Sequence, residues 1–85
     1  MYKIEYVESV QDDLLDISKS NKERIRRAIE KKLATNPIEF GQPLQYSLKG
    51  LRRLRVGDYR IIFQIEENKK VVLVVKIGHR KEVYG

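Results

Sequence analysis

The chain has 85 residues, no cysteine and a formal net charge of +6, and 41% of its residues are hydrophobic and 35% charged. These values predict one globular domain over residues 1–85, and the positive charge either serves solubility or favours a polyanionic partner such as nucleic acid, an anionic membrane surface or an acidic protein. The absence of cysteine excludes disulfides and thiolate metal sites, and with a single histidine we expect the protein to use no metal and no cofactor. Because there is no apolar run long enough to span a bilayer and no N-terminal signal pattern, we expect a cytoplasmic protein.

A short strand and two helices are predicted for the first part of the chain. The segment YKIEYV at residues 2–7 alternates as a strand does. Ser9 offers an N-cap for a helix over residues 9–19, and Asn21 offers one for a second helix that runs to about Thr35. Because the connection between them is so short, we expect the two helices to form an antiparallel hairpin.

Three strands are predicted after a loop that contains both prolines, NPIEFGQPLQYSLKG. They are LRRLRV, YRIIFQIE and VVLVVKI, joined by turns at GD and ENKK. The last of them is apolar on both faces, which favours a place inside the sheet. The order of elements predicts an α+β fold: an N-terminal strand, a two-helix hairpin and a three-stranded antiparallel meander, with the helices packed on one face of the sheet.

Positive charge is concentrated around the first strand of the meander. Five basic residues stand there with a single acid, Asp58: Lys49, Arg52, Arg53, Arg55 and Arg60. Because side chains alternate along a strand, Arg53 and Arg55 share a side, opposite Leu54. A solvated face would use lysine as readily, whereas the planar fork of arginine suits phosphate. Periodicity alone leaves open which face of the next strand, that of Arg60 or that of Tyr59, is the core.

The C-terminal segment IGHRKEVYG is expected to meet this cluster. In an antiparallel meander the end of the third strand lies beside the start of the second, where Arg60 stands. His79, Arg80 and Lys81 therefore emerge next to Arg60. The sequence predicts that the tail and the arginines of the first strand converge at one end of the sheet.

Arginines, one histidine and a tyrosine near a common point can cleave RNA without a metal. The ribose 2′-hydroxyl supplies the nucleophile, and arginines stabilise the charge that develops on the phosphate. His79 is open to three roles, namely proton transfer, substrate contact or packing under the tail. Tyr84 can transfer a proton or stack on a base. No acyl-transfer triad, glycine-rich phosphate loop or pair of glycosidase carboxylates is recognisable.

The stretch LRRLRVGDYRIIFQI, followed by an apolar strand and IGHRKEVY, resembles the RelE/ParE superfamily of type II toxins over essentially the whole chain. GHRKEVY points to the RelE branch. The resemblance implies a RelE-like fold and an endoribonuclease that enters the ribosomal A site and cuts the mRNA being translated. It also implies an antitoxin that wraps around the toxin and holds it inactive.

Site residues follow from this resemblance position by position. Arg60 and Arg80 match the phosphate-stabilising arginines of the family, and Tyr84 matches its C-terminal catalytic tyrosine. Arg53 matches one of two basic residues on the preceding strand. His79, in the same tail, completes the catalytic set that we expect.

The second basic position falls on Leu51, which departs from the family pattern. Arg52 or Arg55 can compensate, so the identity of the general base stays open. The remaining basic side chains are expected to bind RNA: Lys49, Arg52, Arg55 and Lys81.

Two other functions remain open. A ParE-like toxin of similar fold would inhibit DNA gyrase, and a non-catalytic basic module would only bind RNA or an acidic protein. For the preferred reading the expected partners are an acidic antitoxin, the ribosome and mRNA, with no membrane. The toxin alone is expected to be a monomer and to form a hetero-oligomer with its antitoxin.

Overall fold

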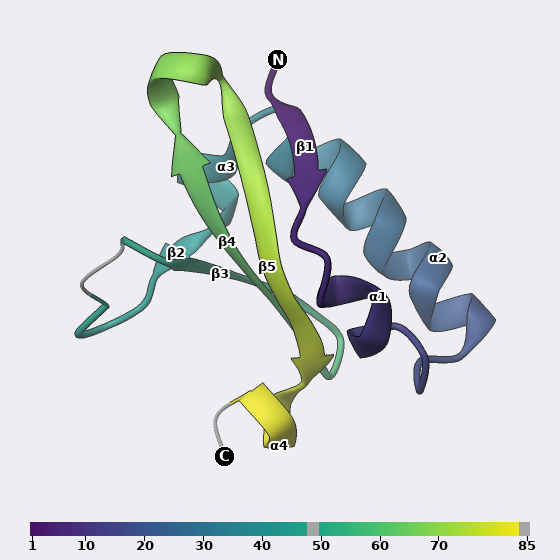
Figure 1. Ribbon diagram of the computed structural model, residues 1–85. Coiled ribbons are helices and arrows are strands. Elements are labelled where there is room, and N and C mark those ends of the chain that lie inside the picture. Colours follow the sequence, from purple (N-terminus) through teal and green to yellow (C-terminus); the bar gives the residue numbers. More distant parts are fainter. Residues whose placement is uncertain (48–49, 84–85) are drawn as a thin grey trace.

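The computed structural model describes residues 1–47 and 50–83 (Figure 1). Its elements, in chain order, are β1 (Lys3–Tyr6), α1 (Val10–Asp13), α2 (Lys19–Ala28), the π-helical turn η1 (Ile29–Leu33), α3 (Pro37–Phe40), β2 (Gln42–Pro43), β3 (Arg52–Val56), β4 (Tyr59–Glu66), the 3-10 turn η2 (Glu67–Lys69), β5 (Val71–His79) and α4 (Arg80–Val83). None of the helices in these residues has the length and apolar character needed to span a membrane.

One sheet of five strands, in the order β1-β5-β4-β3-β2, forms the centre of the fold. The predicted meander is confirmed, because β3, β4 and β5 pair antiparallel in sequence. The N-terminal strand β1 joins this meander parallel to β5 (Figure 1). The β3–β4 turn consists of Gly57 and Asp58, and Gly57 takes a φ of +59°, which glycine adopts without steric cost.

The first helix is shorter than predicted. The predicted first helix, residues 9–19, is reduced to α1, because the N–H groups of Leu15 and Ile17 then bond three residues back, as in tight turns. The second helix begins earlier than predicted, since the Ser18 hydroxyl, rather than Asn21, caps α2. It continues through η1 nearly to the expected end.

The predicted proline-containing loop holds two further elements. The Asn36 side chain accepts a hydrogen bond from the Glu39 amide, so Asn36-Pro37 starts α3 rather than only ending the preceding helix. The short strand β2 then pairs with the start of β3. Between them, Gly41 lies against the Phe63 ring so closely that no side chain fits there.

The core lies between the helices and one face of the sheet. The residues that form it come from α1 to η1 on one side and from β3, β4 and β5 on the other: Val10, Ile17, Ile25, Ile29, Leu33, Leu54, Ile61, Phe63, Val72, Val74 and Ile77. The α+β prediction with helices on one face is thereby confirmed. On the opposite face of β4, Arg60 and Ile62 are also buried, at 6% and 5% exposure. Both faces of β4 are therefore covered, which is why periodicity could not distinguish them.

Candidate nucleic-acid interface

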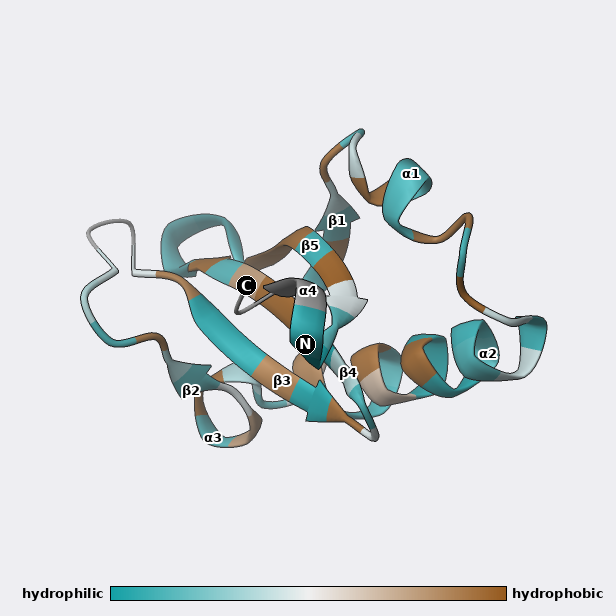
Figure 2. Cartoon of the chain, turned by 90° about the horizontal axis from the view of Figure 1, so that it is seen from below, coloured by the Kyte–Doolittle hydropathy of each residue, from teal (hydrophilic) through white to brown (hydrophobic). Residues whose placement is uncertain are grey.

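Three arginines share the sheet face that points away from the helices. Arg55 stands directly opposite Arg60, and Arg53 stands opposite Ile62 on the neighbouring strand. Directly opposite residues of an antiparallel pair project to the same side, and Figure 2 shows the alternation of polar and apolar residues along β3. We call the side formed by Arg53, Arg55 and Arg60 the arginine face.

The three side chains differ in their surroundings. Arg60 is buried, and its Nη1 donates to the carbonyl oxygens of Tyr59 at 3.2 Å and Gly57 at 3.5 Å. Arg53 is partly exposed and donates through Nη2 to Gln42 Oε1 at 2.6 Å. Arg55 is exposed. A guanidinium keeps its charge even when buried, so this face carries a fixed positive field with one rigidly held member and one open to solvent.

The tail leaves the sheet at the same end. Gly78 of β5 pairs with Arg60, and two residues later the Arg80 amide donates to the Asp58 carbonyl oxygen at 2.8 Å. This bond fixes the start of α4 beside the β3–β4 turn (Figure 1). The side chains of Arg80 and Lys81 are exposed there. The structure thus brings the first turn of the tail next to the arginine face, as the sequence predicted.

Two expected site residues do not join this face. His79 pairs with Tyr59, on the helix side of the sheet, and its ring meets the Tyr59 ring edge-on at 5.8 Å between centroids. Its Nδ1 accepts a hydrogen bond from the Lys81 amide at 3.3 Å. Arg52 also faces the helix side, and its Nη2 donates to the Ile38 and Gly41 carbonyl oxygens at 2.9 Å each. Arg52 is thereby engaged in holding the end of α3.

Two other expected site residues, Lys49 and Tyr84, lie outside the residues that the structure describes. Their positions in the chain follow the β2 segment and α4, respectively. Their roles therefore stay predictions.

His79 faces acids of the first helical segment. It lines a cavity of about 320 Å³ together with Asp12, Asp13 and Asp16. Among the described residues no three histidine, cysteine or acidic side chains are grouped so that they could hold a metal ion. Asp13 instead accepts hydrogen bonds from the Ile77 amide at 3.0 Å and from Lys76 Nζ at 3.2 Å. Sequence reasoning missed this role, since nothing local marks Asp13 as a partner of β5.

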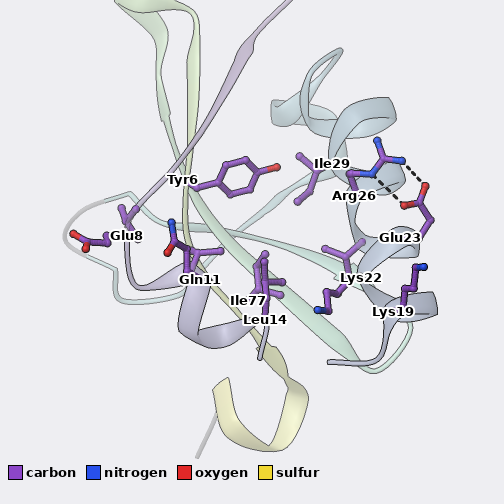
Figure 3. A pocket seen from close by; sticks show the side chains of 13 residues that line it. Tyr6, Glu8, Gln11, Leu14, Lys19, Lys22, Glu23, Arg26, Ile29 and Ile77 are labelled. Atoms are coloured by element: carbon purple, nitrogen blue, oxygen red, sulfur yellow. Dashed lines mark hydrogen bonds and ion pairs between the residues drawn. The ribbon is translucent and has the colours of Figure 1, made fainter. Parts of the chain in front are cut away.

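A larger groove of about 480 Å³ opens between β1, α1 and α2 (Figure 3). Tyr6, Leu14, Ile29 and Ile77 provide apolar surface, and charged side chains from α2 surround it: Lys19, Lys22, Glu23 and Arg26. Arg26 pairs with Glu23 and Glu30, and the bonds from Arg26 lower the pKa of the Glu23 carboxyl. Burial at the groove, with a smaller effect from Glu30, raises the pKa of the Tyr6 phenol. The groove was not foreseen, because it combines three segments whose own patterns show only amphipathic elements.

Comparisons with known proteins agree with this architecture. The chain matches the model of the ParE toxin of type II toxin–antitoxin systems, parDE, over residues 4–84. RelG and RelE of Mycobacterium tuberculosis are 31% and 36% identical to it over 52 residues, 61% of the chain, and these matches span 60% and 54% of the two relatives.

Among solved structures, the M. tuberculosis RelBE2 toxin–antitoxin complex contains a chain of the same fold, with a TM-score of 0.85 and 23% identity. The match covers 93% of this chain and 98% of that one. Because the family model spans nearly the whole sequence and the arginine face, the tail and the meander occur in the predicted arrangement, the chain belongs to the RelE/ParE superfamily of type II toxins.

Proposed function

We propose that the protein is a RelE-type endoribonuclease that cuts mRNA in the ribosomal A site without a metal. The observation that carries the proposal is a row of paired residues across three strands: Arg55 pairs with Arg60, and Arg60 pairs with Gly78. This row places the arginine face beside the start of the tail helix. A phosphate above Arg60 would lie between charges from β3 and from α4. Curated relatives named RelE and RelG support the RelE branch.

The proposed reaction is an internal transfer of the phosphoryl group. The ribose 2′-oxygen loses its proton to a base and attacks the adjacent phosphorus, the bond to the 5′-oxygen breaks, and that oxygen takes up a proton. The products are a 2′,3′-cyclic phosphate and a 5′-hydroxyl end. Arg60 and Arg80 stabilise the added charge on the phosphate oxygens, with Arg53 beside them. Tyr84 is the proposed proton-transfer group of the tail, whereas His79 supports the tail from the other side of the sheet.

Translating extracts test this function directly. Added protein should leave mRNA cut at A-site codons, and Arg80→Ala should fold but cut about 100-fold or more slowly, because a transition-state charge partner is lost. Lys69→Ala, an exposed lysine at the far end of the sheet, is the matched control. Tyr84→Phe should slow cutting more than it weakens ribosome binding. Uncut mRNA with folded protein would reject the proposal.

Gyrase inhibition is the second candidate function. It is favoured by the family model, whose description is that of a ParE toxin, and by Leu51 at a position where RelE-type toxins carry a basic residue. It predicts inhibited supercoiling and intact mRNA. Supercoiling assays run beside the translation assay separate the two functions, and salt-sensitive RNA binding without either effect would indicate a binding module alone.

The proposed partner is an acidic antitoxin that wraps around the toxin. The M. tuberculosis RelBE2 neighbour is a toxin–antitoxin complex. The groove between β1, α1 and α2 offers such a segment apolar surface and the two lysines Lys19 and Lys22 at its rim. Leu14→Asp, in the groove, should weaken capture of the product of the neighbouring reading frame, while Leu15→Asp should not, since Leu15 lies outside the groove at 77% exposure. Failure of co-expressed chains to associate would count against this partner.

A further inference from the structure

A separate cavity of about 280 Å³ lies at the outer edge of β3. Within the part of the chain that the structure describes, β2 pairs only with Arg52 and Arg53, so the edge of β3 beyond Arg53 has no strand beside it. Residues from η1 and from the α3–β2 segment border the opening instead. The cavity is lined by Lys32, Phe40, Gln42, Arg53, Leu54 and Arg55.

The lining combines an aromatic ring with three cations. Phe40 is 44% exposed although it is a large apolar side chain, and Lys32 Nζ lies 5.8 Å from its ring centre. Arg53, bonded to Gln42, and the exposed Arg55 complete the charge. No carboxylate is among the six lining residues. Such a site repels cations and attracts an anion that also carries a flat apolar surface.

This cavity continues the arginine face. Arg55 belongs to both, because it lines the cavity and stands opposite Arg60 on the neighbouring strand. Neighbouring strands are about 5 Å apart. An RNA strand that crosses the sheet from Arg60 therefore places its next phosphate near the edge of β3.

We propose that this cavity is a nucleotide-binding subsite for single-stranded RNA. The base stacks on the Phe40 ring in place of the Lys32 ammonium, which lies over that ring in the free protein, and the phosphate of the same nucleotide lies between Lys32 and Arg55. Stacking on an exposed ring within a basic groove is how proteins hold single strands without reading their sequence. The role of this subsite in cleavage rests on the proposed function, since the subsite would hold a nucleotide next to the one cut at Arg60. RNA binding itself can be measured without cleavage.

The test measures binding of the full chain to a short fluorescent oligoribonucleotide with 2′-O-methyl groups, which cannot be cut because the nucleophile is blocked. Phe40→Leu should weaken binding about tenfold, because base stacking requires a ring. Phe40→Tyr keeps a ring and should bind as tightly as wild type. An oligonucleotide without bases should bind wild type and Phe40→Leu equally. Lys32→Gln should reduce the slope of log affinity against log salt by about 0.7, as expected for one phosphate contact on a single strand.

Lys31→Gln is the matched control, since Lys31 is the exposed neighbour on η1 that does not line the cavity. Equal affinity of Phe40→Leu and wild type, or equal losses for Lys31→Gln and Lys32→Gln, overturns the subsite. A cavity that instead bound an acidic peptide in a Phe40-dependent way, with RNA indifferent to Phe40, overturns it as well. Thermal melts verify that each variant is folded.

Parallel translation assays keep the two proposals apart. Ring-dependent RNA binding with intact mRNA supports the subsite and rejects the nuclease. Cut mRNA with binding indifferent to Phe40 supports the nuclease and rejects the subsite.

Discussion

Arginines close together in this sequence have different roles, which depend on their surroundings. Arg60 is buried and bonded to backbone carbonyls, whereas Arg55 opposite it is exposed. Arg52 faces the other side and holds α3. The bonds to backbone carbonyl oxygens hold the buried Arg60 guanidinium in one orientation, whereas the Arg55 side chain is open to solvent. In the proposed cleavage, Arg60 would supply the fixed phosphate contact and Arg55 the adaptable one.

His79 is expected to stabilise the start of the tail helix α4. Its Nδ1 accepts from the Lys81 amide at the start of α4. His79→Ala should remove this bond, worth about 1 kcal/mol for a helix cap, and raise the exchange rate of that amide about fivefold. His79→Asn should retain protection, because asparagine caps helices well. Amide hydrogen exchange gives the answer, and unchanged exchange in His79→Ala would show that the contact contributes nothing to the tail.

Gly41→Ala should destabilise the fold. Its φ of −96° is open to any residue, so the cause is contact rather than conformation: an added Cβ would overlap the Phe63 ring and approach the Pro37 carbonyl oxygen at 2.9 Å. Phe63 is fully buried and cannot move aside. The free energy of unfolding should fall by about 1–3 kcal/mol in denaturant titrations. Ile38→Ala, at a 55% exposed neighbour, should cost clearly less.

At the scale of elements, β5 depends on two different neighbours along one edge. From Val71 to Val74 this edge pairs with β1. Beyond Val74, the carboxylate of Asp13 in α1 accepts a hydrogen bond from the Ile77 amide. The one-turn helix α1 therefore satisfies a backbone donor at a strand edge through its Asp13 side chain.

Removal of the Asp13 carboxylate should expose this dependence. Asp13→Ala leaves the partly buried Ile77 amide without its acceptor and should lower the free energy of unfolding by about 1–3 kcal/mol. Asp13→Asn keeps an acceptor and should lose less, through the weaker contact with Lys76. Asp12→Ala, at an exposed neighbour, is the control. Urea titrations in which all three variants match wild type would contradict this role.

The junction between β1 and the β4–β5 turn should give a pH dependence. Hydrogen bonds from Lys70 and then from Tyr2 lower the pKa of the Glu67 carboxyl. A lowered pKa adds stability above the unfolded value of about 4.3, and this stability is lost as the pH falls through the folded value. The Tm difference between wild type and Glu67→Gln should therefore shrink as the pH falls below about 4.3. Thermal melts over a pH series measure this difference, and a difference that stays constant from neutral pH to pH values below about 4.3 would contradict it.

At the scale of the whole molecule, one group of positive charges lies where the arginine face and the tail meet, and a second lies along α2 and η1. The net charge of +6 alone would serve solubility as well. Part of this charge is concentrated on one side of the molecule, because Arg53, Arg55 and Arg60 share a face of the sheet. The exposed side chains of Arg80 and Lys81 lie beside that face. The groove between β1, α1 and α2 lies on the helix side, so a partner in it need not occupy the arginine face.

Salt dependence should separate these surfaces. If RNA crosses the arginine face, Arg55→Gln should lower the slope of log affinity against log salt by about 0.7 for a single strand. Lys69→Gln, at the far end of the sheet, should leave the slope nearly unchanged. Fluorescence anisotropy over a series of salt concentrations measures both. Equal slopes for wild type and Arg55→Gln would mean that phosphates do not contact this face.

The sequence by itself determined the strands of the meander, the existence of the helices, the common side of Arg53 and Arg55, and the approach of the tail to Arg60. These follow from alternation, capping and antiparallel order, which are local or depend only on chain direction. The expected length of the first helix was wrong, because the backbone continues after Asp13 in tight turns that the apolar spacing of residues 9–19 does not indicate.

Only the tertiary structure decided on which side His79 lies. A bulge in β5 sets Ile62 opposite Lys76 but Phe63 opposite Val74, so the facing of side chains changes within an apolar run that gives no sign of it. Burial on both faces of β4, the anchoring of Arg52 and the cavity at Phe40 likewise arise from contacts between segments distant in sequence. Periodicity reports which residues share a side, whereas only packing reports what covers that side.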